Sequence, residues 1–189
     1  MNTQAHAIFN LAILSRKRQP EWNPLIIWGA LIPDLTMFGF FLLMKISGIP
    51  EPQIWGVEYF RPFWQTTFDI FNSIPLALAG MGLMFYFKRT GIALLFISIV
   101  LHCLEDLPLH YDDGHRHFWP LSDFRYQSPV SYWDPDHYGQ IVAPIEFMLV
   151  LIVSVYVFKR VRSPFTRGLV VVANVLPPVI VFLYFALFS

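Results

Sequence analysis

Charged residues are scarce in this sequence of 189 residues, since Asp, Glu, Lys and Arg together make up 14% of it. Acidic and basic residues are equal in number, so the formal net charge is zero and there is no basic stripe that would bind nucleic acid. Hydrophobic residues account for 56% of the chain and aromatic residues for 17%. This composition argues against a nucleic-acid partner and indicates a membrane protein in contact with a lipid bilayer.

Cysteine and several well-known motifs are also nearly or wholly missing. Cys103 is the single cysteine, so no disulfide can form within the chain, and we expect a small apolar side chain in a helix. Gly-rich phosphate loops and GxSxG nucleophile elbows do not occur. The first residues, MNTQAHAIFNLAIL, have no basic region ahead of the apolar part and no small-residue cleavage site, so we expect them to remain in the mature protein.

Long apolar runs are what the sequence does contain. Several of them have about 18 to 22 residues, which is enough for a helix to cross a bilayer. We predict an all-α fold, a polytopic membrane helical bundle of about five transmembrane helices plus a short N-terminal helix, in a single membrane-embedded domain over residues 1–189. The helices are expected at about 3–15, 25–46, 69–87, 91–109, 141–158 and 168–188.

The segments between these runs alternate in charge. RKRQPEWNP, KRT and KRVRSPFTR are basic, GIPEPQIWGVEYFRP is balanced, and residues 110–140 are acidic. By the positive-inside rule, the three basic segments face the cytoplasm and the other two face outward. The loop at about 110–140 is therefore predicted to lie outside the cytoplasm.

Ionisable residues from different predicted helices fall at a similar depth. At a rise of 1.5 Å per residue, His6, Asp34 and His102 each lie about 14 to 17 Å from the basic end of their helix, and Asp106 follows His102 by one turn on the same face. An isolated ionisable group inside a membrane costs about 2.5 to 3.5 kcal/mol. We therefore expect these groups to cluster around a cation.

His6, Asp34, His102 and Asp106 form a set of nitrogen and oxygen ligands that favours zinc, or manganese or iron if further oxygens join. The His102–Asp106 pair is the strongest part, because the i, i+4 spacing points both side chains at one site. Two alternatives remain. Asp34 follows Pro33 and could hydrogen-bond a neighbouring helix at a plain kink, and His6 could be a neutral imidazole satisfied in a helix interface.

Three more polar residues lie near the outward ends of the predicted helices. Asp69 is a candidate catalytic base that could instead be a helix N-cap. Asn72 is a candidate for substrate binding, or it could hold helices together by hydrogen bonds. Glu146 is a candidate general base or further ligand, although a carboxylate near a helix N-terminus is favourable on electrostatic grounds alone.

The loop from His110 to Gln140 holds four of the six histidines and is rich in Asp, Trp, Tyr and Pro. A connection of about 30 residues without periodicity is usually a lid or a binding loop, and its aromatic content argues against disorder. His110, Trp119 and His137 are the candidates for substrate binding. The aromatic residues could equally form an interfacial belt, and Asp113-Gly114 is typical of a solvated turn.

Three motifs together resemble the bacterial membrane-bound metal-dependent hydrolase family: HAIFNLAIL, WGALIPDLTMF and LHCLEDLPLHYDDGHRHFWPLSD. The order of the N-terminal His, the Pro-Asp pair and HxxxD is also distantly similar to the zinc-dependent phospholipase C pattern. The resemblance covers most of residues 1–125. It implies that His6, Asp34, His102 and Asp106 are the metal ligands, in a small protein of the bacterial inner membrane.

The chain departs from that family in the third predicted helix. There the family typically has a His-Ser pair, whereas this sequence reads DIFNSIP, with Asn72 in the histidine position. The change could remove one metal of a multinuclear site or the activity itself. Asp69, one turn earlier on the same face, could substitute.

The favoured hypothesis is a membrane-embedded metal-dependent hydrolase that uses a metal-activated water on a phosphoester or another ester of a lipid-like substrate, with Asp69 or Glu146 as base. Two other classes stay open. A transport or proton-relay protein could use the same groups as a polar path, and a structural protein could use a metal or a hydrogen-bond network to fasten its helices. The oligomeric state is not predicted.

Overall fold

The computed structural model describes the backbone of residues 1–188, and side chains through Leu176 and at Val179. Residues 1–188 form helices and no strand, which confirms the all-α class. The main helices are α1 (Thr3–Leu14), α2 (Asn23–Ile46), α3 (Glu51–Gln53), α4 (Pro62–Phe71), α5 (Ile74–Tyr86), α6 (Thr90–Asp106), α7 (Gly139–Arg160) and α8 (Pro164–Phe188). Short helical turns occur at Pro20–Trp22, Ile54–Glu58, Leu107–Leu109 and Pro135–His137.

Fewer helices can span a membrane than the roughly five expected. Three segments in the described part of the chain are long and apolar enough, namely Pro20–Ile46, Thr90–Leu109 and Gly139–Arg160. A fourth exists if α4 and α5, which are bent by 42° at a short break, together count as one span. The expected span at 168–188 extends beyond the described side chains, and its apolar part is described as Pro164–Leu176.

The single helix expected at 69–87 is wrong, because the chain forms two helices there. Asn72 and Ser73 separate α4 from α5, and α4 begins already at Pro62. Ser73 is the N-cap of α5, since its hydroxyl accepts a hydrogen bond from the Leu76 N–H at 3.1 Å. Pro75 follows in the first turn, where a proline loses no helical hydrogen bond. Asp69 is thus not an N-cap but lies inside α4.

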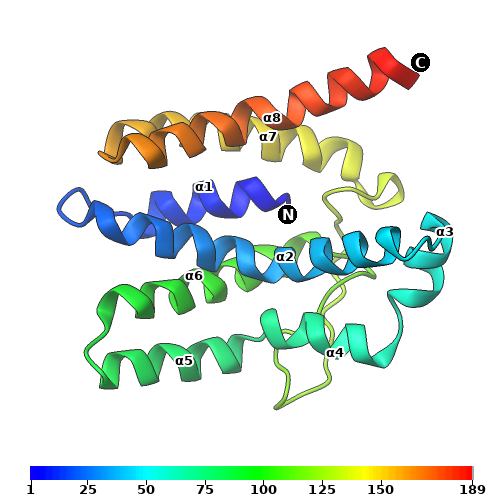
Figure 1. Ribbon diagram of the computed structural model, residues 1–189, viewed down its shortest axis with the longest axis horizontal. Helices are drawn as coiled ribbons and strands as arrows, with labels where there is room; N and C mark the ends of the chain where they lie inside the picture. Colours follow the sequence, from blue (N-terminus) through cyan, green and yellow to red (C-terminus); the bar gives the residue numbers. More distant parts are fainter. Residues whose placement is uncertain (189) are drawn as a thin grey trace.

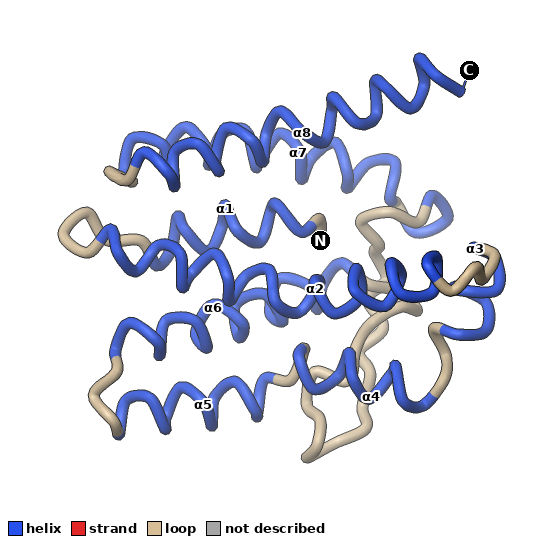
Figure 2. The backbone as a smooth tube through the Cα atoms, viewed as in Figure 1, coloured by secondary structure: helices blue, strands red, loops and turns tan. Residues whose placement is uncertain are grey.

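The helices run roughly side by side, with α1 between the α7–α8 pair and the α2–α6 pair (Figure 1). The turns after α1, α5 and α7, which carry the three basic segments, lie at one end of the bundle. The loop between α6 and α7 lies toward the opposite end, beside α4 (Figure 2). The structure therefore gathers the basic turns at one end, as the alternating charges require.

Close packing of α2 on α6 fixes the depth of the polar residues between them. A Cβ atom added at Gly29 would lie 2.2 Å from the Leu95 carbonyl oxygen, so only glycine permits this approach. The hydroxyl of Ser98 donates to the Ile26 carbonyl at 2.6 Å, and the Asn10 amide of α1 donates to the Ser98 hydroxyl at 2.8 Å. Small and amide side chains thus bind α1, α2 and α6 together one to two turns from the candidate site.

Candidate metal centre

Three predicted ligands meet in the interior, where α1 crosses the end of α6. His6, His102 and Asp106 each offer a ligand atom, and these atoms lie within 4.8 Å of one another. All three side chains are buried. The two imidazole rings stack with centroids 3.7 Å apart and an angle of 21° between their planes. Residues that are 96 positions apart in the chain are thus held in one group by the packing of two helices.

The orientation of both imidazole rings is fixed through Nδ1. Nδ1 of His6 donates to Oε2 of Glu105 at 2.8 Å, and Nδ1 of His102 donates to the carbonyl oxygen of Ala30 at 2.7 Å. A carboxylate and a carbonyl oxygen can only accept, so these bonds place the proton of each neutral ring on Nδ1. The lone pair is then on Nε2, which is the usual arrangement of histidines that bind a metal.

Both Nε2 atoms face Asp106 and have no hydrogen-bond partner among the described residues. Nε2 of His6 lies 3.1 Å from Oδ1 of Asp106, and Nε2 of His102 lies 3.1 Å from Oδ2. A lone pair that faces a carboxylate oxygen at this distance is unfavourable unless a positive charge lies between them. The group therefore needs either a cation or additional protons, and its donor set fits a divalent cation.

Asp34, the fourth predicted ligand, lies at the edge of this group. Its Oδ1 atom is 3.6 Å from Nε2 of His102, and its Oδ2 atom accepts a hydrogen bond from the Thr3 hydroxyl at 2.6 Å. Pro33 lies within α2 and does not end the helix. The side chain of Asp34 is thus close enough to take part in chemistry at the centre without being one of its three closest ligands.

Asp106 also contacts groups outside the histidine pair. The main-chain nitrogen of Met1 lies 2.6 Å from Oδ1 of Asp106 and 3.2 Å from Nε2 of His110. His110 lies 3.3 Å from the same oxygen and is a predicted substrate-binding residue. The structure thus brings His110 to the rim of the centre.

A cavity of about 320 Å³ adjoins the centre on the side of the 110–140 loop. Its walls include Asp34, Asp106, His110, Asp113 and His115. This volume is at the lower end of the range of about 300 to 1,000 Å³ that is typical of small-molecule sites. A second cavity, of about 590 Å³, shares Met37, Trp55, Asp113 and Tyr132 with the first and extends toward Trp133.

The rim of the cavity carries a charged pair from the loop. Nδ1 of His110 lies 3.0 Å from Oδ1 of Asp113. Burial alone would lower the pKa of His110, but its contacts with Asp106 and Asp113 raise it. Burial would raise the pKa of Asp113, and the contact with His110 lowers it. Both shifts favour the ionised pair, while burial lowers the pKa of the nearby His115 to about 3 and keeps that ring neutral.

The two predicted bases are bonded elsewhere. Asp69 is fully buried, and it accepts hydrogen bonds from the backbone N–H of Arg116 at 2.8 Å and from Nε of Arg116 at 2.6 Å. Glu146 accepts hydrogen bonds from the backbone N–H and the side-chain amide of Asn2, at 2.9 and 2.8 Å. Neither residue belongs to the His6, His102 and Asp106 group. Asp69 instead holds the long loop, and Glu146 holds the start of α1 against α7.

The remaining candidates for substrate binding are also held by the chain. The carbonyl oxygen of Asn72 accepts from Nδ1 of His117 at 3.0 Å, and the carbonyl of Trp119 accepts from the Ser73 hydroxyl. Nδ1 of His137 donates to Asp134 at 2.6 Å, and the ring stacks on Tyr111. Asn72, Trp119 and His137 are not among the residues that line the cavity beside the centre.

Glu105, Thr3 and His115 are parts of the site that sequence reasoning missed. Glu105 is three residues after His102, so the i, i+3 spacing puts it on the same side of α6, and selection by the i, i+4 pair alone passed over it. It is nevertheless one of the few acidic residues in an apolar helix, and that scarcity was a usable signal. Thr3 and His115 carry no comparable signal, because their roles depend on where α1 and the loop fold back.

Comparison with protein-family models, with curated proteins and with solved structures found no match for this chain. The resemblance to membrane-bound metal-dependent hydrolases therefore rests on the three motifs alone.

Proposed function

We propose that the chain is a membrane-embedded, metal-dependent hydrolase that acts on a phosphoester or another ester of a lipid-like molecule. The observation that carries this proposal is the pair of buried Nε2 lone pairs of His6 and His102 that face the carboxylate of Asp106. Three protein ligands beside an open cavity are typical of catalytic zinc sites, where the remaining position is left for water or substrate. Manganese or iron would suit the same donors if more oxygens joined.

The cation would supply two things, namely polarisation of the scissile group and a lowered pKa of a water in the open position. The protein provides the rest. Glu105 and the Ala30 carbonyl keep Nε2 of each histidine pointed at the centre. Asp34 is proposed to accept the proton of the water, because it lines the cavity and its only hydrogen bond in the described structure comes from the Thr3 hydroxyl.

The surroundings of the centre support a lipid-like substrate. The group lies beside α2 and α6, which are apolar enough to span a bilayer, and the cavity next to it is walled by Met37, Phe38, Phe41 and Trp55 as well as by its polar groups. A substrate that reaches this position from the bilayer must be partly apolar. We further propose a bacterial inner-membrane location, with the loop at 110–140 outside the cytoplasm, in keeping with the basic turns at the other end.

A structural role is the second candidate, and one observation favours it. The same 3.1 Å distances fit ion pairs between Asp106 and protonated imidazoles, which would fasten α1 to α6 without any metal. The two candidates predict different metal contents.

The test is elemental analysis of detergent-purified protein that has been prepared without chelator. Wild type should contain about one zinc, manganese or iron per chain. His102→Ala and Asp106→Asn should contain none, because each removes a ligand. His137→Ala, which changes a histidine of the loop, is the matched control and should keep the metal. An absence of metal from the wild type would overturn the hydrolase and leave the structural role.

Activity is then measured with phospholipids in mixed micelles. His102→Ala should abolish phosphoester hydrolysis. Asp34→Asn should lower kcat by about 100-fold or more, within the usual range for a general base, while the metal content stays unchanged. Loss of the metal in Asp34→Asn would make Asp34 a ligand and contradict its role as proton acceptor.

A further inference from the structure

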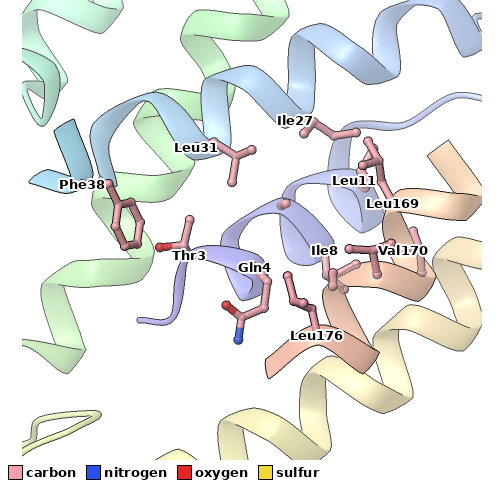
Figure 3. A pocket seen from close by; sticks show the side chains of 13 residues that line it. Thr3, Gln4, Ile8, Leu11, Ile27, Leu31, Phe38, Leu169, Val170 and Leu176 are labelled. Carbon is pink, nitrogen blue, oxygen red and sulfur yellow. The ribbon is translucent and has the colours of Figure 1, made fainter. Parts of the chain in front are cut away.

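An apolar groove runs beside α1, between α2 and α8, and its volume is about 280 Å³. Figure 3 shows its labelled side chains, with Thr3 and Phe38 at one end and Leu11, Leu169 and Val170 at the other. Thr3 and Gln4 are the only polar residues among those that line it. The side chains of Ile8, Leu11 and Val170 are buried, whereas Phe38, Val172 and Leu176 are exposed. The groove thus has a closed floor and a rim that is open to the outside of the bundle.

The groove lies next to the cavity of the candidate metal centre. Thr3 and Phe38 line both spaces. The hydroxyl of Thr3 is also bonded to Asp34, whose other oxygen lies 3.6 Å from His102. One side of Thr3 therefore borders an apolar space, and its hydroxyl marks the edge of the polar centre.

We propose that this groove holds one acyl chain of the lipid substrate, with the ester group at the metal centre. The inference rests on the proposed function and adds a substrate class to it: a lipid with at least one long apolar tail, which enters sideways through the rim between α2 and α8. The apolar lining of the groove suits the hydrocarbon of an acyl chain. The polar headgroup stays outside the groove and keeps its hydrogen-bond partners.

The lining and the position of the groove fit an acyl chain. Apart from Thr3 and Gln4, every lining residue is apolar, and a hydrocarbon chain needs no polar partner. An acyl chain also accounts for the position of the groove beside the cavity, because its ester end must leave the apolar part at Thr3, which lines both spaces.

The experiment uses the full-length protein in phosphatidylglycerol vesicles that contain a trace of the same lipid with a diazirine near the end of one acyl chain. Photo-crosslinked residues are mapped by mass spectrometry. Crosslinks should concentrate on α1, α2 and the start of α8, around Ala7, Ile27 and Leu169. Crosslinks spread evenly over the exposed apolar side chains of all helices would overturn the proposal.

Two variants block the groove from different helices. Ala7→Phe and Ala173→Phe place a ring in it, and each should lower the crosslink yield in the groove about tenfold, which corresponds to the lost burial of about two methylenes. Ala79→Phe, on the exposed face of α5, is the matched control and should leave the yield unchanged. An unchanged yield in both groove variants, or an equal fall in the control, would also overturn the proposal. Retention of the metal shows that each variant is folded.

A second readout separates the groove from the catalytic function. His102→Ala should lose hydrolysis and keep the crosslinks, since the groove does not need the metal. The groove variants should raise KM for a long-chain phospholipid and leave hydrolysis of a water-soluble short-chain phosphoester unchanged. If the wild-type protein hydrolyses neither the long-chain phospholipid nor the short-chain phosphoester but still crosslinks in the groove, the proposed reaction is wrong and the lipid site stands. If hydrolysis of long-chain lipid is insensitive to blocking, the groove proposal fails while the reaction stands.

Discussion

Two buried carboxylates of this protein, Asp69 and Asp106, have opposite surroundings. Asp69 is 0% exposed and Asp106 is 3% exposed. Asp69 faces a guanidinium and a backbone N–H, at 2.6 and 2.8 Å, and both donate to it. Asp106 faces the Nε2 atoms of His6 and His102, whose Nδ1 protons are directed to other acceptors. Asp69 has its counter-charge in the side chain of Arg116, whereas the nearest side chains that face Asp106 are imidazoles, and the main-chain nitrogen of Met1 lies 2.6 Å from its Oδ1 atom.

This difference separates a structural carboxylate from one that can bind a ligand. A guanidinium is permanently charged and matches a carboxylate in shape, so Asp69 and Arg116 neutralise each other and tie the loop to α4. A neutral imidazole held through Nδ1 offers no proton to Asp106 and leaves a place for a cation. Burial alone therefore does not identify the functional residue, and the direction of the neighbouring donors does.

The largest expected effect on stability comes from breaking the Asp69–Arg116 pair. Asp69→Ala removes the acceptor of two hydrogen bonds from Arg116 to a buried carboxylate, each worth about 1.5 to 3 kcal/mol, and should lower the free energy of unfolding by about 3 to 5 kcal/mol. Thermal unfolding in detergent measures this. The metal content per folded chain should remain that of wild type, because Asp69 does not belong to the centre.

The matched control is Asp123→Ala, which removes the other partner of the same guanidinium. The side chain of Asp123 is 84% exposed, so the loss should be below about 1 kcal/mol. If Asp69→Ala instead kept its stability and lost the metal, Asp69 would belong to the centre, and the contrast between the two carboxylates would be wrong.

An intermediate effect is expected when the orientation of His6 is released. Glu105→Ala removes the acceptor that holds Nδ1, and the affinity for the metal should fall by about 10- to 100-fold, as is usual when such an outer partner is lost. Competition with a metal chelator measures the affinity. Glu105→Gln keeps an acceptor oxygen and should recover most of the loss. Equal affinity in Glu105→Ala and wild type would show that the ring needs no such support.

The sequence was sufficient to predict that His6, His102 and Asp106 come together. Hydropathy locates the helices, and a helix has a fixed rise per residue, so the depth of a polar group can be calculated before any contact is known. The break at Asn72 and Ser73 was harder to see, because the apolar run continues through it. Its signal was local, namely a Ser with a Pro two residues later, which is typical of a helix start.

The partner of Asp69 could not be predicted from spacing. Arg116 is 47 residues further along the chain and belongs to a loop without periodicity, so only the folded loop brings it to α4. The same holds for Thr3 and His115, which reach the cavity from a helix start and from the loop. The role of Glu105 depends on the packing of α1 on α6, which brings Nδ1 of His6 to 2.8 Å from its carboxylate.

The smallest expected effect comes from the protonation of His115. Its measurement tests whether the loop that Asp69 anchors is packed as firmly as the centre itself. Burial lowers the pKa of His115 from 6.5 to about 3. Below pH 6.5 the unfolded chain therefore binds a proton that the folded chain excludes, and this contribution to stability is lost progressively as the pH falls from 6.5 toward 3. At pH 5.5 the loss should be about 1 kcal/mol.

In His115→Phe, which cannot bind a proton, the decrease in stability between pH 7 and 5.5 should be smaller by that amount. His137→Phe changes a loop histidine that is 29% exposed in its side chain and serves as the control for removing a histidine as such. Identical pH dependence of wild type and His115→Phe would mean that water reaches the loop, and that its anchoring at Asp69 does not close it.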